Sequence, residues 1–195
     1  MDLAGAGVRA TLRSHPNRRA PAMSLDLKTL IRDIPDFPTP GVQFKDITPL
    51  LFDPAGFRES VQQLADPWRG EAIELVAGVE ARGFIFAAAV ALELGAGFVP
   101  LRKPGKLPAR TRSAAYQLEY GETELQLHEV PKLERKRVLL IDDVIATGGT
   151  LDAARWLVLQ SEAVLVGIGA LIELKSLNGR RRAAGTRLEV VLQFD

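Results

Sequence analysis

Residues 138–150 have the sequence VLLIDDVIATGGT, and this stretch decides the fold class. Its first four side chains are all apolar, which is typical of a strand buried on both faces of a parallel sheet. Asp142 and Asp143 follow, and a small, hydroxylated turn then leads into a helix expected over residues 150–160. Because ligands of open α/β sheets bind beyond the carboxyl ends of the strands, this turn is the first candidate for a binding site.

The turn has the composition of a phosphate cradle. Gly148 and Gly149 allow a tight turn with inward N–H groups, and the start of a helix adds a positive dipole. Thr147 and Thr150 add hydroxyl donors, while the two acids can accept hydrogen bonds from a ribose diol. The G-x-G-x-x-G and G-K-[ST] patterns are missing, so the turn is neither a dinucleotide fingerprint nor a P-loop. The alternative is that these acids and glycines only cap a helix.

Working outward, strands and helices alternate along the chain. Strands are expected over residues 73–79, 98–101, 138–141, 164–174 and 188–194, and helices over residues 84–94 and 150–160. Residues 115–120 and 122–130 predict a hairpin that turns at Gly121. Continuous apolar strands that alternate with helices predict an α/β fold, with a mainly parallel twisted sheet flanked by helices.

The region before residue 70 predicts two helices and a shaped loop. A helix is expected behind Ser24, with Pro35 as its end. Residues 36–49 contain several prolines and a glycine around Phe44, which favours a rigid loop. Asp53 and Pro54 form a cap followed by proline at the first helical position, so a second helix begins there.

Composition limits the classes of protein. The 195 residues are 47% hydrophobic and 25% charged, as in an ordinary globular protein, and residues 23–195 are expected to form a single domain. We expect residues 1–22, which carry four arginines, to be a disordered extension with Met23 as the functional start. With 25 basic and 24 acidic residues, the net charge of +1 gives no large field for nucleic acid or a membrane surface.

Other sites and locations are also limited by residue content. The chain has no cysteine, which excludes disulfides and thiolate metal sites and fits a cytoplasmic location. Only two histidines occur, and His128 is expected on a strand. The apolar stretch over residues 83–101 is interrupted by glycines, a glutamate and a proline, so we expect no membrane span.

Residues 138–150 resemble the phosphoribosyl pyrophosphate (PRPP) signature of type I phosphoribosyltransferases. Four further segments resemble the adenine phosphoribosyltransferases within that family, in the same order along the chain. They are residues 37–49 (FPTPGVQFKDITP), 79–84 (VEARGF), 102–108 (RKPGKLP) and 116–121 (YQLEYG). The resemblance covers about residues 25–195.

The resemblance implies a fold, a reaction and partners. The fold is the type I phosphoribosyltransferase fold, with a small N-terminal hood and a mobile flap. The reaction is a pentosyl transfer in purine salvage, in which adenine and PRPP give AMP and diphosphate. A homodimer is implied, as is Mg²⁺ bound mainly through PRPP, with no direct protein ligand.

The resemblance also assigns roles to residues of the phosphate and base sites. Asp142 and Asp143 are expected to contact the ribose hydroxyls. The loop that holds the 5′-phosphate consists of Ala146, Thr147, Gly148, Gly149 and Thr150. Phe44 is expected to stack on adenine while the backbone of Gln43 reads its edge. Lys45 is also expected at this adenine site. Some family members carry arginine at this position, and a lysine offers a point charge instead of a planar fork.

Diphosphate contacts are expected from two segments. Arg82 lies between a strand and a helix, where an arginine can grip diphosphate with a forked contact, and the resemblance adds a strained peptide nearby. Residues 102–112 contain five cations, two prolines and a glycine, which favours a mobile flap. Arg102, Lys103 and Lys106 are its expected diphosphate contacts. A surface arginine and a solvated loop are the alternatives.

Glu119 is the expected catalytic acid, together with Arg82. It lies on a strand directly after the flap, so its carboxylate could stabilise the positive charge that the purine gains during attack. The resemblance supports this role. The alternative is that Glu119 is the solvent-facing member of an alternating strand.

Two rival functions remain. The first is a phosphoribosyltransferase for hypoxanthine, guanine or xanthine, which would share the loop over residues 142–150. The second is a transcriptional regulator that keeps the fold, but such a protein needs a separate DNA-binding module with a basic face. The basic run over residues 180–182, with Arg187, is expected to be a solvated loop or a dimer rim, and no function is assigned to it.

Overall fold

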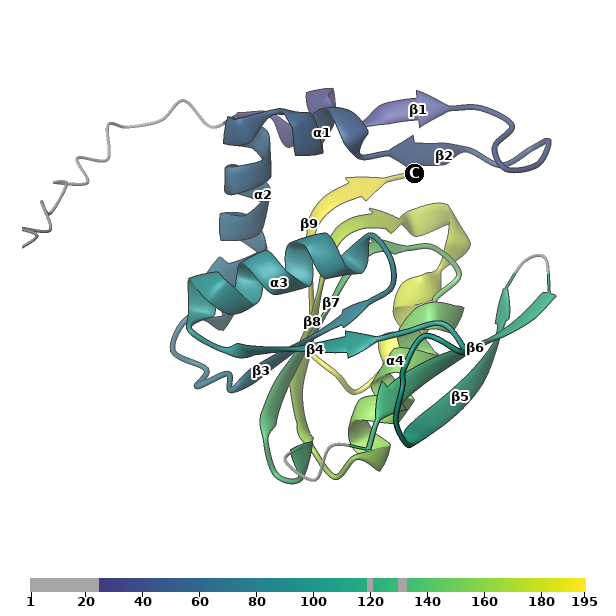
Figure 1. Ribbon diagram of the computed structural model, residues 1–195. Helices are drawn as coiled ribbons and strands as arrows, with labels where there is room; N and C mark the ends of the chain where they lie inside the picture. The colour runs from purple at the N-terminus through teal and green to yellow at the C-terminus, as the bar shows by residue number, and fades with distance from the viewer. Residues whose placement is uncertain (1–24, 119–120, 130–132) are drawn as a thin grey trace, which may run out of the picture.

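The computed structural model describes residues 25–118, 121–129 and 133–195, and its centre is a five-stranded parallel sheet (Figure 1). The strand order is β4-β3-β7-β8-β9, and all four neighbouring pairs run parallel. The strands are β3 (Leu75–Val79), β4 (Gly97–Leu101), β7 (Arg137–Ile145), β8 (Val164–Leu174) and β9 (Leu188–Phe194). The expected α/β fold with a mainly parallel sheet is therefore confirmed.

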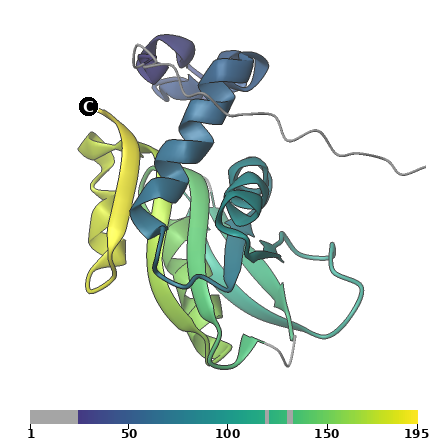
Figure 2. The ribbon, with the colours of Figure 1, turned by 90° about the vertical axis from the view of Figure 1, so that its left-hand side faces the viewer.

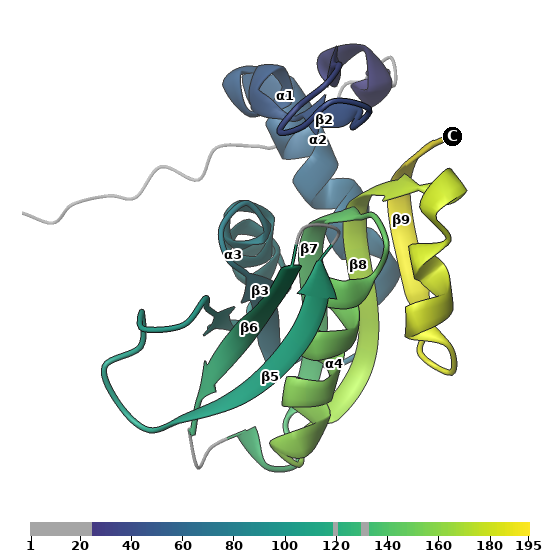
Figure 3. The same ribbon diagram turned by 90° about the vertical axis from the view of Figure 1, so that its right-hand side faces the viewer.

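Helices cover both faces of this sheet. On one face lie α2 (Pro54–Ala65) and α3 (Gly83–Leu94), and Figure 2 shows α2 descending along the sheet. On the other face lie α4 (Gly149–Gln160) and a hairpin of β5 (Thr111–Leu118) and β6 (Gly121–His128), which Figure 3 shows side by side. The predicted start of α2 is confirmed, because the Asp53 carboxylate accepts a hydrogen bond from Gly56 N at 2.7 Å and Pro54 is the first helical residue.

The region before α2 forms a small layer above the sheet, which we call the hood (residues 25–52). Its elements are a 3₁₀ helix η1 (Leu27–Leu30), β1 (Arg32–Ile34), β2 (Phe44–Asp46) and α1 (Thr48–Phe52). The expected single helix up to Pro35 is wrong, because the chain becomes extended at Ile31 and β1 pairs antiparallel with β2. An ion pair of 2.6 Å between Arg32 and Asp46 reinforces that pairing, which local helical spacing cannot reveal.

Two other elements differ from expectation in their bounds. The hairpin begins at Thr111 instead of residue 115, so the last part of the expected flap is strand; we call residues 102–110 the flap. Strand β7 continues to Ile145, so Asp142 and Asp143 lie inside a strand instead of after it. The reason is that β8 continues beside β7 and pairs with both Asp142 and Ile145.

The chain from β8 to β9 passes through two short 3₁₀ helices, η4 (Lys175–Leu177) and η5 (Gly179–Ala183). Another 3₁₀ helix, η2 (Asp66–Trp68), follows α2. No helix in the described part of the chain combines the length and the apolar character that a membrane crossing requires.

Candidate active site

A cavity of about 810 Å³ lies between the hood and the carboxyl ends of β7 and β8. Its volume is in the usual range for a small-molecule site. Five segments that are distant in sequence line it: the hood, Arg82, the loop from β7 to α4, the chain from the end of β8, and Asp195 after β9. The lining residues include Gln43, Phe44, Lys45, Ala146, Thr147, Gly148, Gly149, Thr150, Leu174, Ser176 and Leu177.

The loop between β7 and α4 presents free backbone donors. Gly148 has a φ of +83°, and a Cβ there would lie only 2.6 Å from the carbonyl oxygen of Gly179, so a side chain cannot fit without a shift. Within the described residues, none of the N–H groups of residues 147–150 donates a hydrogen bond. These donors stand at the start of α4, where the helix dipole favours an anion.

The two acids of β7 are buried next to each other. Asp142 and Asp143 are each 6% exposed, and Asp143 N donates to Asp142 Oδ1 at 2.9 Å. Gly83 packs directly on this carboxylate, since a Cβ there would lie 2.7 Å from Asp142 Oδ1. Burial raises the pKa of both carboxyls, and the charge of Asp143 raises the pKa of Asp142 further.

Arg82 connects the acids to the aromatic residue of the hood. Its Nε lies 2.7 Å from Asp143 Oδ2, but the two groups are not aligned as a hydrogen bond. Its guanidinium carbon lies 4.9 Å from the centre of the Phe44 ring, a cation–π contact. The nearby peptide bond between Glu80 and Ala81 is cis. One partly exposed cation thus lies between the buried acids and the expected base site.

The hood orders the residues expected around adenine. Phe37 and Phe44 make an edge-to-face contact with ring centres 5.1 Å apart. The Lys45 ammonium pairs with Asp33 and lies 4.2 Å from the centre of the Phe194 ring. Lys45 therefore connects β1 to the end of β9, and its charged group is engaged within the protein.

The flap cations gather around Glu80 and do not line the cavity in the described structure. The Glu80 carboxylate accepts hydrogen bonds from Arg102 Nε at 3.2 Å and from Lys103 N at 3.0 Å. The Lys106 ammonium lies 3.4 Å from the same carboxylate. These donors lower the pKa of Glu80 although its partial burial acts in the opposite direction.

The structure brings together many of the residues that the sequence singled out. Residues 43–45, Arg82 and residues 146–150 line one cavity, whereas Asp142, Asp143 and the flap cations are not among its lining residues. Glu119 lies outside the described residues. The sequence did not predict the cavity wall formed by residues 174–177. It also did not predict that the Glu80 carboxylate pairs with the flap cations, although Glu80 lies in the segment 79–84.

Comparison with known proteins identifies the family. Residues 57–190 match the phosphoribosyl transferase domain. The chain is 53% identical to an adenine phosphoribosyltransferase of Thermobifida fusca over 173 residues. This match covers 87% of this chain and 98% of that protein. The chain belongs to the adenine phosphoribosyltransferase family.

Solved structures agree with this assignment. The adenine phosphoribosyltransferase of Thermoanaerobacter pseudethanolicus has a TM-score of 0.83 at 46% identity, over 86% of this chain and 98% of that chain. The Saccharomyces cerevisiae enzyme was solved in complex with an imino-altritol bisphosphate and adenine. It has a TM-score of 0.80 at 35% identity, over 85% of this chain and 96% of that chain. The fold is the type I phosphoribosyltransferase fold, and the reaction is transfer of phosphoribose from PRPP to adenine, which gives AMP and diphosphate.

Proposed function

We propose that the single cavity holds both substrates of this adenine phosphoribosyltransferase reaction, with adenine at the hood and PRPP along the carboxyl edge of the sheet. The observation that carries the assignment is that residues 43–45 and 146–150 line the same cavity. The free N–H groups of residues 147–150 take the 5′-phosphate, and Asp142 and Asp143 accept hydrogen bonds from the ribose hydroxyls. Phe44 stacks on adenine, and the backbone of Gln43 reads its edge.

Arg82 exchanges partners when the substrates bind. In the free protein its guanidinium contacts the Phe44 ring and the Asp143 carboxylate. Diphosphate is a stronger partner for a guanidinium than an aromatic ring, because it offers several charged acceptors. Movement of Arg82 toward diphosphate therefore leaves the ring face free for adenine and places a positive charge on the leaving group.

Mg²⁺ is proposed to bind mainly through PRPP. The described residues contain no group of three His, Asp or Glu side chains that converge as a metal cage. Mg²⁺ keeps several waters and often binds through substrate phosphates, so the residues present fit an ion carried by the substrate. When bound, such an ion neutralises charge on the diphosphate.

The chain's own groups then favour displacement at the ribose C1 by N9 of adenine, with inversion. Arg82, with Arg102, Lys103 and Lys106 from the closed flap, stabilises the departing diphosphate. Glu119 is proposed to stabilise the positive charge that develops on the purine. The flap excludes water, which would otherwise hydrolyse the activated sugar.

Turnover with separate purine bases tests this function. The full chain is incubated with PRPP and Mg²⁺, and with adenine, hypoxanthine, guanine or xanthine as the only base. We expect nucleotide formation with adenine alone, because a base site that hydrogen-bonds one purine edge leaves groups unpaired with the others. Equal turnover of hypoxanthine or guanine would contradict the base assignment, and DNA binding without turnover would favour a regulator.

A homodimer through α3 is also proposed. The outward side of this helix carries Ile85, 39% exposed, and Leu92, 84% exposed, and the neighbouring strand adds Phe98 at 38%. Exposed apolar residues that gather on one face are typical of a protein interface, and a second copy of the chain is the occupant that the family resemblance implies. Light scattering on Leu92→Lys should then show monomer, with Leu159→Lys on α4 as the control.

The extension and the location stay predictions. Residues 1–22 are proposed to lie outside the catalytic domain, residues 23–195, so their removal should leave turnover and melting temperature nearly unchanged. A large loss of either would contradict these domain bounds. The cytoplasmic location rests on the sequence alone.

A further inference from the structure

The basic run over residues 180–182 contains one arginine that is not a solvated charge. Arg180 makes a forked contact with Glu173, with Nε to Oε1 at 2.9 Å and Nη2 to Oε2 at 2.7 Å. Glu173 is only 4% exposed and also accepts a hydrogen bond from Gln193 Nε2 at 3.0 Å. A buried carboxylate needs such partners, because its desolvation is costly otherwise.

Glu173 lies within the central sheet. It lies near the carboxyl end of β8, opposite Ile145 of β7 on one side and Gln193 of β9 on the other. Arg180 belongs to η5, which leaves the sheet after β8. The forked contact therefore ties a short 3₁₀ helix to a strand in the middle of the carboxyl edge.

This 3₁₀ helix supports the phosphate loop by direct backbone contact. A Cβ on Gly179 would lie 2.2 Å from the carbonyl oxygen of Ala146 and 2.9 Å from Gly148 N. In the reverse direction, a Cβ on Gly148 would lie 2.6 Å from the carbonyl oxygen of Gly179. No side chain fits between the two backbones, so a shift of η5 must be transmitted to the loop.

The same segment forms a wall of the cavity. Leu174, Ser176 and Leu177, which lie between Glu173 and Arg180, all line it. Arg182 approaches α4 on the far side of the loop, with Nη1 3.7 Å from Asp152 Oδ2. Residues 174–183 thus contact the loop and its helix along one side, and Arg180 makes the forked contact that holds this segment to the sheet.

We propose that Glu173 and Arg180 are a positioning pair for the 5′-phosphate loop, which hold η5 against residues 146–148 so that the loop keeps its N–H groups aimed into the cavity. The inference rests on the proposed phosphate site. Neither residue lines the cavity. Their effect is specific to the phosphate end of PRPP, because η5 packs on residues 146–148 of the loop, whereas the proposed adenine contacts at residues 43–45 come from the hood.

The test compares Arg180→Met with Arg181→Met, which removes the same charge one residue away. Binding of ribose 5-phosphate and of adenine to the full chain is measured separately by calorimetry. For Arg180→Met we expect the Kd of ribose 5-phosphate to rise about tenfold, because small displacements of a preorganised site are costly. The Kd of adenine should change less than about twofold, and Arg181→Met should match the wild type for both ligands.

Conservative variants distinguish a displaced phosphate loop from a general loss of folding. Arg180→Lys keeps the charge but loses the fork, so it should recover part of the ribose 5-phosphate affinity. Glu173→Gln combined with Arg180→Met should lose no more affinity than the worse single variant, since the two residues act as one unit. Equal losses for adenine and ribose 5-phosphate in the folded Arg180→Lys variant would overturn the proposal.

The wild type distinguishes failure of this inference from failure of the proposed function. If the wild type binds no ribose 5-phosphate, the phosphate site itself is wrong. If the wild type binds it and Arg180→Met binds it equally well, the site stands and the positioning pair is wrong.

Discussion

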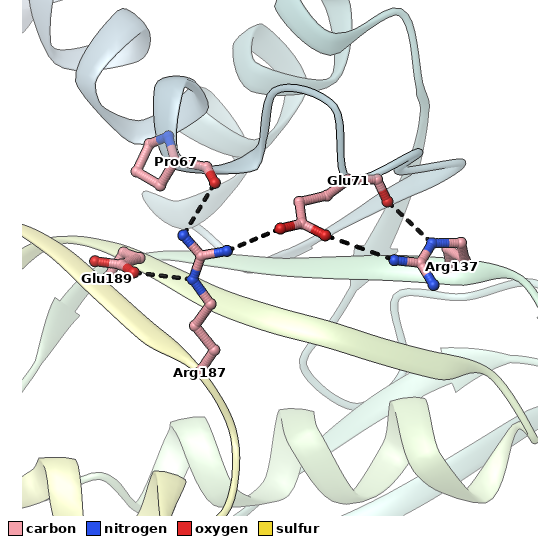
Figure 4. Close-up of polar contacts among 5 residues, drawn as sticks. All are labelled: Pro67, Glu71, Arg137, Arg187 and Glu189. Atoms are coloured by element: carbon pink, nitrogen blue, oxygen red, sulfur yellow. Dashed lines mark hydrogen bonds and ion pairs between the residues drawn. The ribbon is translucent and has the colours of Figure 1, made fainter.

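Charged groups gather at both edges of the central sheet, but those beside the phosphate loop at the carboxyl edge are less completely paired than those at the amino edge. There, Arg187 donates to Glu71 Oε1 at 3.0 Å, to Glu189 Oε1 at 2.9 Å and to the Pro67 carbonyl at 3.0 Å (Figure 4). Arg137 donates to the carbonyl oxygen of Glu71 at 2.9 Å. Both arginines donate hydrogen bonds to neighbouring carboxylate or carbonyl oxygens. The side chains of the arginines and of the two glutamates stay partly exposed.

Beside the phosphate loop, at the carboxyl edge, the arrangement is the opposite. Asp142 and Asp143 are buried side by side, and their pKa values are raised by that burial. The N–H groups at the start of α4 have no acceptor among the described residues. Such an arrangement is unfavourable for folding, and proteins keep it where a ligand completes it. The difference supports the proposal that the carboxyl edge binds the substrates, whereas we expect the network at the amino edge to contribute only to stability.

The largest effect is expected when the buried acids lose their charge. Replacing both Asp142 and Asp143 by asparagine removes two charged acceptors for the ribose hydroxyls, each worth roughly 1.5–3 kcal/mol. We expect kcat/KM for PRPP to fall about a hundredfold or more, measured by steady-state turnover. Retention of normal PRPP use by the folded variant would show that the acids are not at the ribose.

Stability should change in the other direction. Because their pKa values are raised in the folded protein, these acids favour folding at low pH and lose that contribution as the pH rises through the raised values. The double variant has no carboxyl groups at these two positions, so it does not lose stability in this way as the pH rises. Its melting temperature relative to the wild type should therefore increase as the pH rises above 3.8, the ordinary pKa of an aspartate. A variant whose relative melting temperature does not increase with pH would assign the acids to the folded framework.

A smaller but still catalytic effect is expected at Glu119. If its carboxylate stabilises charge on the purine, Glu119→Ala should lower kcat about tenfold or more at saturating adenine, while PRPP still binds. Glu122→Ala, on the other side of the hairpin turn, is the control and should leave kcat unchanged. Near-normal kcat in Glu119→Ala would leave the chemistry to base positioning and flap closure.

A change of a few fold in the favourable direction is expected at Glu80. This carboxylate holds Arg102 and Lys106 in the free protein, so it competes with diphosphate for them. Glu80→Gln should tighten diphosphate binding about threefold, as expected for removal of one partly screened charge. Glu74→Gln, whose partner Lys136 lies at the amino edge, should bind diphosphate as the wild type does. Weaker binding in Glu80→Gln would mean that Glu80 positions the cations instead of competing for them.

The sequence predicts those parts of the site that are local in the chain. The β7 strand, its two acids and the glycine turn occupy 13 consecutive residues, so periodicity and composition predict the loop at the carboxyl edge. Contacts between distant residues have no such local pattern. Arg180 looks like a solvated cation until the fold places it beside Glu173, and the hood strand β1 depends on its pairing with β2.

The smallest effect is expected at the amino edge, where Arg187→Met removes the centre of the network in Figure 4. The guanidinium is 42% exposed and also lies 4.5 Å from the centre of the buried Trp68 ring. Exposed ion pairs contribute only about 0–1 kcal/mol each, and the methionine side chain keeps much of the contact with the ring. A loss of about 1 kcal/mol in the free energy of unfolding lowers the melting temperature of a protein of this size by about 2–4 °C, and we expect a fall of that size here. The values of kcat and of both KM should stay within about twofold of the wild type, because no group in this network reaches the cavity. Thermal melts and steady-state kinetics on the same preparation measure both quantities. A catalytic loss comparable to that of the Asp142 and Asp143 double variant would show that the two edges are coupled through the sheet, and the division between a stabilising edge and a binding edge would be wrong.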